Sequence, residues 1–77
     1  MNKDRRKQLK NAIDKLQDVV YLLNDVKDDE DFAFNNLPEG LQCSMRGQDM
    51  EENINELEES VDAIGDVINV LDSIIYK

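Results

Sequence analysis

The strongest constraint on this chain is a heptad pattern between Asp49 and Tyr76. Apolar residues recur there in alternating steps of four and three with no polar interruption, at Met50, Ile54, Leu57, Val61, Ile64, Ile68, Leu71 and Ile75. This spacing places them on one face of a long helix. A second row widens the stripe near its end, at Val67, Val70 and Ile74. Because a lone helix cannot bury such a stripe, the chain needs a partner helix, either its own or that of another copy.

The N-terminal part of the chain repeats this pattern and then interrupts it. The first seam runs in the same steps through Leu9, Ile13, Leu16, Val20 and Leu23, and a neighbouring row contains Ala12, Val19, Leu22 and Val26. A face this wide favours a bundle over a simple two-stranded coil. Lys27 and Glu30 stand where the seam would continue, which predicts that it fails there. We therefore expect residues 28–31 to be solvated, frayed or bent, with helix persisting weakly to about residue 34.

A stop and turn separates the two helical patterns. Asn35 and Asn36 can take the left-handed cap conformation, Pro38 disfavours helix at the residue before it, and Gly40 is a further breaker. Leu37 and Leu41 are apolar within this polar stretch, so we expect the loop to fold back over the bundle end. The second helix starts from about Met45 with Ser44 as its N-cap, or one turn later with Asp49 and Glu52 as a capping box.

Together these patterns predict an all-α chain, formed as one antiparallel two-helix hairpin domain over residues 1–77. Its helices are expected at about residues 3–34 and 45–76. Domains of 77 residues have difficulty burying enough surface without oligomerising. Two helices also leave part of each wide apolar face uncovered, so we expect a homodimer that forms a four-helix bundle. A monomeric hairpin is the alternative. The predicted oligomer core contains Leu9, Ile13, Leu16, Val20, Leu23, Ile54, Leu57, Val61, Ile64, Ile68, Leu71 and Ile75.

The residue inventory offers little for catalysis or metal binding. The chain has one cysteine, Cys43, and no histidine, so no internal disulfide, zinc site or histidine-activated nucleophile is expected. The acidic run at residues 28–31 lacks the spacing and glycine of a calcium loop. We therefore expect neither an enzyme nor a metal or cofactor. A single cysteine suits a reducing cytoplasm, and the apolar runs are too short for a membrane span.

Charge is distributed unevenly along the chain. Residues 25–62 carry thirteen acidic and two basic residues, a net charge of −11, whereas the remainder carries +2, which gives −9 overall. This balance disfavours direct binding to nucleic acid or to anionic membranes. Basic residues at the start of the first helix and acidic ones near its end both oppose the helix dipole.

Two interpretations of this charge pattern remain open. In the first, the acidic residues provide solubility, and the basic N-terminal segment contacts the acidic part of another copy. In the second, the acidic end imitates a nucleic-acid backbone and binds a host protein with a basic surface. The acidic face in that case contains Glu51, Glu52, Glu56 and Glu59.

The loop before the second helix is the best candidate for specific recognition. Gln42, Ser44 and Arg46 provide hydrogen-bond donors for an anion such as a nucleotide phosphate, next to a helix N-terminus. A structural interpretation is the alternative: Ser44 caps the helix, Arg46 pairs with Asp49 or a glutamate, and apolar loop residues close the bundle end. Those apolar residues are Leu37, Leu41 and Cys43.

The same loop carries a resemblance. The stretch from Phe34 to Arg46 reads F-x-N-L-P-x-x-L-Q-x-S-x-R and precedes an acidic helix. It resembles small acidic helical proteins of phages, prophages and mobile elements of bacteria, in which such a stretch joins two helices. That resemblance implies a bacterial cytoplasmic setting and a protein that binds a host factor or defence component. A sponge for a nucleotide-type signal, an acidic nucleic-acid mimic and a purely structural assembly module remain alternative functions.

Overall fold

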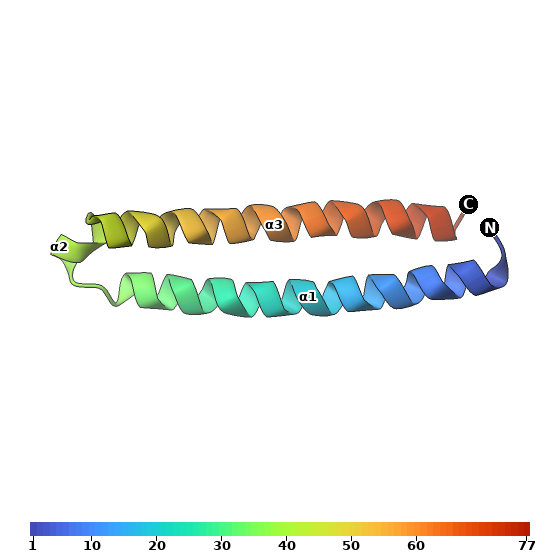
Figure 1. Ribbon diagram of the computed structural model, residues 1–77, viewed down its shortest axis with the longest axis horizontal. Coiled ribbons are helices and arrows are strands. Elements are labelled where there is room, and N and C mark those ends of the chain that lie inside the picture. The colour runs from blue at the N-terminus through green and yellow to red at the C-terminus, as the bar shows by residue number, and fades with distance from the viewer.

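The computed structural model describes residues 1–77 and confirms the all-helical prediction. Three helices follow one another, α1 at Lys3–Asn35, α2 at Glu39–Gln42 and α3 at Met45–Ile75. Figure 1 shows α1 and α3 lying side by side and running in opposite directions, with α2 at one end and both termini at the other. The Cα trace is long and thin, with principal extents of 58 × 15 × 12 Å.

The ends of α1 are fixed by asparagine side chains. The Asn2 side chain accepts a hydrogen bond from the Arg5 N–H at 2.8 Å, which satisfies one of the free donors of the first turn. At the other end the Asn36 side-chain amide donates to the Phe32 carbonyl at 2.7 Å. Asn36 has φ −92°, and no residue of the chain has positive φ, so the expected left-handed cap is wrong.

The connection between the long helices is more regular than expected. The predicted loop contains the one-turn helix α2, which includes Gly40, so this glycine does not act as a breaker. Pro38 precedes α2 with an extended backbone and is its N-cap. Proline is suited to this place because the first N–H groups of a helix have no intrahelical acceptor.

The contact between α1 and α3 follows the two predicted seams. The seam side chains are half-buried along both helices, and only Met50 and Ile75 among apolar residues are buried, at 9% and 5% exposure. The residues predicted as oligomer core therefore form the contact within one chain. Two helices side by side shield only one stripe of each, so the seam remains accessible at its edges.

A polar layer continues the seam across its expected break. Lys27 and Glu30 are half-buried at seam positions, the Lys27 Nζ lies 3.6 Å from the Glu58 Oε1, and the Asn53 side-chain amide donates to the Glu30 Oε2 at 3.0 Å. Both polar side chains thus have partners on α3. Of the outcomes expected for residues 28–31, solvent exposure is confirmed at Asp28, Asp29 and Asp31. Fraying and a bend are wrong, because α1 continues without interruption to Asn35, close to the expected end at residue 34.

No helix of this chain combines the length and the apolar character needed to cross a membrane.

Replacing the polar layer by apolar residues tests its energetic role. We expect Lys27→Leu combined with Glu30→Leu to raise the free energy of unfolding by about 1–3 kcal/mol, because partly exposed polar pairs contribute little and leucine adds apolar burial. Thermal or urea unfolding followed by circular dichroism measures this. The control Asp28→Leu, one residue away on an exposed side, should change stability by no more than about 0.5 kcal/mol. Destabilisation by the double variant would show that the polar contacts outweigh apolar burial.

Candidate functional site

The loop residues proposed to bind an anion are partly used within the loop itself. The Gln42 side-chain amide donates to the Phe34 and Leu37 carbonyls at 3.4 and 3.3 Å, which ties α2 to the end of α1. The Ser44 hydroxyl accepts from the Gly47 N–H at 3.4 Å and donates to the Leu41 carbonyl. Ser44 is therefore the N-cap of α3, and the alternative start at Asp49 is wrong.

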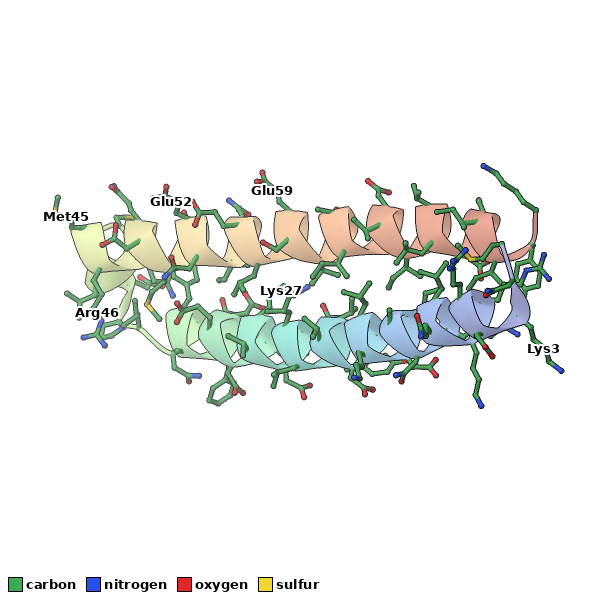
Figure 2. All side chains as sticks on the ribbon, turned by 45° about the vertical axis from the view of Figure 1, so that its right-hand side comes forward. Lys3, Lys27, Met45, Arg46, Glu52 and Glu59 are labelled. Carbon is green, nitrogen blue, oxygen red and sulfur yellow. The ribbon has the colours of Figure 1, made fainter.

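Arg46 differs from Gln42 and Ser44 because its side chain has no hydrogen-bond or ion-pair partner within the chain. It is exposed, and Lys27–Glu58 is the only ion pair in the molecule, so the expected pairing of Arg46 with Asp49 or a glutamate is wrong. Figure 2 shows Arg46 at the α2 end of the molecule. Anion binding at this loop stays a prediction that depends on Arg46.

Apolar closure of this end is weaker than expected. Leu37 is half-buried, whereas Leu41 is 49% exposed and Cys43 is exposed. Gly47 instead provides the close contact, because a Cβ atom there would lie 2.6 Å from the Gln42 carbonyl carbon and 2.7 Å from the Leu41 carbonyl oxygen. The absence of a side chain at Gly47 allows α2 to lie against the first turn of α3.

The four glutamates of the predicted acidic face are all exposed and form no ion pair. Figure 2 shows Glu52 and Glu59 on the outer side of α3, pointing away from α1. Glu56 lies instead beside the groove between the helices, with Val26. The acidic partner face stays a prediction, which loss of binding to a basic partner on replacing all four glutamates by glutamine would support.

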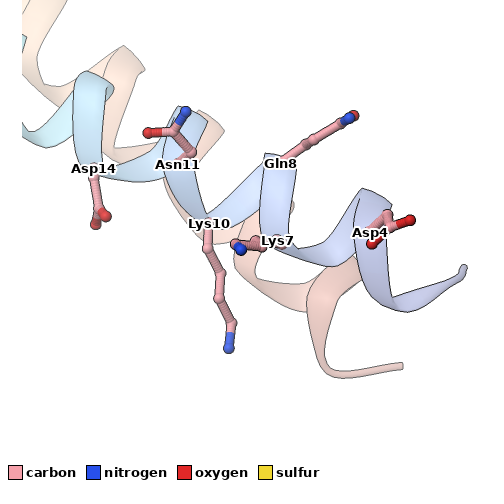
Figure 3. Close-up of a pocket in the computed structure, with 6 residues that line it drawn as sticks. All are labelled: Asp4, Lys7, Gln8, Lys10, Asn11 and Asp14. Carbon is pink, nitrogen blue, oxygen red and sulfur yellow. The ribbon is translucent and has the colours of Figure 1, made fainter.

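A polar depression on the N-terminal part of α1 does not form a site. It is lined by Asp4, Lys7, Gln8, Lys10, Asn11 and Asp14. Figure 3 shows these side chains pointing away from one another rather than converging on a common point. Across the molecule, no three cysteine, histidine, aspartate or glutamate side chains are placed to hold a metal ion together.

The two lateral sides of the helix pair differ in chemical character. On one side, shallow grooves between α1 and α3 are lined mainly by polar residues, including Gln17, Asn24, Asp31, Glu58 and Asn69. We call this the polar lateral side. Gly65 opens onto one of these grooves, and a Cβ atom there would have no heavy atom of another part of the chain within 4 Å, so this glycine does not serve a close helix contact.

The opposite side carries the second apolar rows of both helices. Val26 and Ser60 line one groove there, which shows that these two rows face the same way. On α1 the exposed Lys15 interrupts the row between Val19 and Ala12. Stepping by three or four residues from this groove, away from α2, the apolar members of the rows are Leu22, Val19 and Ala12 on α1 and Ala63, Val67, Val70 and Ile74 on α3. We call these residues together with Val26 the lateral apolar face.

Most of the lateral apolar face is open to solvent. Val19, Leu22, Val26, Val67 and Val70 are between 42% and 62% exposed. The sequence identified both rows, except for Ala63, but not that they lie on one side of the molecule. That fact depends on the register between α1 and α3. Apolar side chains are therefore exposed together over two neighbouring helices.

Comparison with known proteins gives no match to this chain among family models, curated proteins or solved structures.

Adding a methyl group at Gly47 tests the α2–α3 contact. We expect Gly47→Ala to lower the free energy of unfolding by about 1–3 kcal/mol, because the new Cβ overlaps backbone atoms of α2. Gly65→Ala is the matched control, with open space around its Cβ, and should raise stability by about 0.5–1 kcal/mol through helix propensity. Equal effects of the two changes in thermal unfolding would contradict the assigned contact.

The loop can also be tested for its structural and binding roles. We expect Ser44→Ala to lower the free energy of unfolding by about 1 kcal/mol through loss of the N-cap, and Arg46→Ala to leave it within about 0.5 kcal/mol. Thermal unfolding of both variants measures this difference. A rise in melting temperature with added nucleotide, abolished by Arg46→Ala, would instead assign the loop to anion binding.

Proposed function

We propose that this protein is a non-catalytic helical interaction module, a hairpin that works by binding through its lateral apolar face. Its partner is a second copy, and the assembly is a four-helix bundle. The observation that carries this proposal is the exposure of the five large apolar side chains of this face on two adjacent helices. Singly exposed apolar residues are ordinary, whereas a contiguous apolar strip marks an interaction site.

The total exposed surface supports an additional packing layer. The chain exposes 5923 Å². A folded monomer of 8.9 kDa would expose about 4,800 Å² by the usual scaling with mass. The excess of about 1,100 Å² is comparable with the ~800 Å² that each partner buries in a standard stable interface. Covering one lateral side would therefore bring the exposed surface of each copy to the level typical of a folded monomer.

The geometry of the second rows also suits a helical partner. Each row is about a quarter-turn of the helix away from the seam, so a further pair of helices can pack against both rows at once. In this arrangement each helix contacts two neighbours, as in a four-helix bundle. The polar lateral side and the acidic outer side of α3 remain free, and they provide the surface on which a host factor would bind.

Charges placed on the lateral apolar face test this proposal. We expect light scattering on the unaltered chain to give twice its 8.9 kDa mass at both low and high salt, because apolar burial is little affected by screening. Leu22→Glu combined with Val70→Glu should shift the mass to that of one chain while circular dichroism still reports helix.

The matched control adds two glutamates to the polar lateral side, as Gln17→Glu and Asn69→Glu. It changes the net charge equally and should leave the dimer intact. A monomeric unaltered chain at concentrations of tens of micromolar would refute self-association, and dissociation by both double variants would refute the assignment to this face.

A further inference from the structure

The charges at the two ends of the lateral apolar face specify how a second copy lies on it. We infer that the two copies pack with their α2 ends at opposite ends of the bundle, so that α1 lies on α1 of the second copy and α3 on α3. This inference rests on the proposed self-association and adds its orientation. A face-to-face dimer with two-fold symmetry has only one alternative orientation, with both α2 ends together and α1 on α3 of the second copy.

The register of α1 against α3 shows which residues share a level. Lys27 contacts Glu58, and Glu30 accepts a hydrogen bond from Asn53. Because the helices run in opposite directions, Asp29 on α1 lies at about the level of Glu56 on α3. On α1 the lateral apolar face is centred on Val19, which places the two-fold axis for α1–α1 pairing near this residue.

Both ends of the lateral apolar face are bordered by charge of a single sign. At the α2 end, Asp29 stands seven residues after Leu22 and Glu56 seven residues before Ala63, and both are exposed. Glu56 also lines the groove that contains Val26, which places it on this side. At the terminal end, Arg5 stands seven residues before Ala12 and is exposed. The apolar strip thus separates an acidic border from a basic one.

The two orientations bring these borders together differently. With the α2 ends together, Asp29 of each copy would lie beside Glu56 of the other, and like charges at an interface disfavour association. With the α2 ends opposed, Asp29 instead faces the segment around Arg5 of the second copy. On α1 the apolar residues match in this orientation, since Val19 meets its own counterpart and Ala12 meets Val26. Charge complementarity therefore favours opposed ends.

The charge of the whole chain acts in the same direction. Residues 25–62, which lie toward α2, carry a net charge of −11, and the rest of the chain carries +2. Within the chain, these charged side chains form a single ion pair, Lys27–Glu58. Because each copy carries a net charge of −9, two molecules polarised in this way repel one another less when their ends are opposed than when they are aligned.

The single cysteine allows a direct measurement of orientation. Cys43 is exposed and lies between α2 and α3, so a spin label can be attached there without introducing a new cysteine. Asn35, the last residue of α1, is roughly 24 Å beyond Val19 at 1.5 Å per residue, and Cys43 lies at the same end. With opposed ends, pulsed dipolar spectroscopy should report a label separation of more than about 50 Å; with aligned ends, helix diameters limit it to roughly 25 Å.

Each result of this measurement has a defined meaning when the mass of the labelled sample is recorded in parallel. A dimer with the long separation supports the inference. A dimer with the short separation overturns the orientation and leaves the proposed function intact. A monomer without dipolar coupling overturns both the orientation and the self-association.

A charge reversal at the basic border provides an independent test. At low salt, Arg5→Glu should weaken the dimer about fivefold or more, and high salt should remove this effect. Lys10→Glu is the matched control: it makes the same charge change at a position seven residues before Gln17, which lines the polar lateral side. Equal dissociation constants for the two variants at low salt would overturn the inference.

Discussion

The narrowness of the contact between α1 and α3 is the constraint on which the rest of this structure depends. A long helix beside one partner shields a single stripe of its surface. Here Met50 and Ile75 are the only apolar residues that are buried. Backbone hydrogen bonds run along both long helices, but each contributes only about 0.5–1.5 kcal/mol net because water competes for the same groups. In the proposed assembly, additional stability comes from covering apolar side chains that the pair leaves open. The second apolar rows are the part of the molecule suited to this, and both occur on the same side.

The polar layer within the seam affects the register between α1 and α3 as well as stability. In the observed register Lys27 and Glu30 both reach partners on α3. A shift of α1 by one heptad that moved Lys27 to the level of Gly65 and Glu30 to the level of Ser60 would keep apolar residues on the inside but remove both partners. The cost of an unpaired, half-buried charge would then oppose the shift. In uniform heptad patterns, alternative registers are close in energy, and polar residues at seam positions are a known way to separate them.

The sequence predicts the helices and the seam because heptad spacing is a local property of each segment. It predicts less well where the outcome depends on residues distant in the chain. The seam was expected to fail at Lys27, since nothing near it in sequence indicates that Glu58 provides a carboxylate across the helix pair. The role of Gly47 has the same origin, because it depends on carbonyl groups of α2 that approach the first turn of α3. The sequence shows both apolar rows of the lateral apolar face. That the two rows lie on the same side of the molecule follows only from the register between α1 and α3.

Apolar burial and charge contribute differently to the proposed assembly, as the sizes of their free energies show. Fully burying a side chain of the size of leucine or valine is worth roughly 1.5–3 kcal/mol, whereas an exposed ion pair is worth about 0–1 kcal/mol. The lateral apolar face therefore supplies the affinity in either orientation of a second copy. The smaller electrostatic energy still decides between the two orientations, because it acts on their difference. The same charges oppose the dipole of α1 within the isolated chain, a local cost that pairing with the opposite end of another copy offsets.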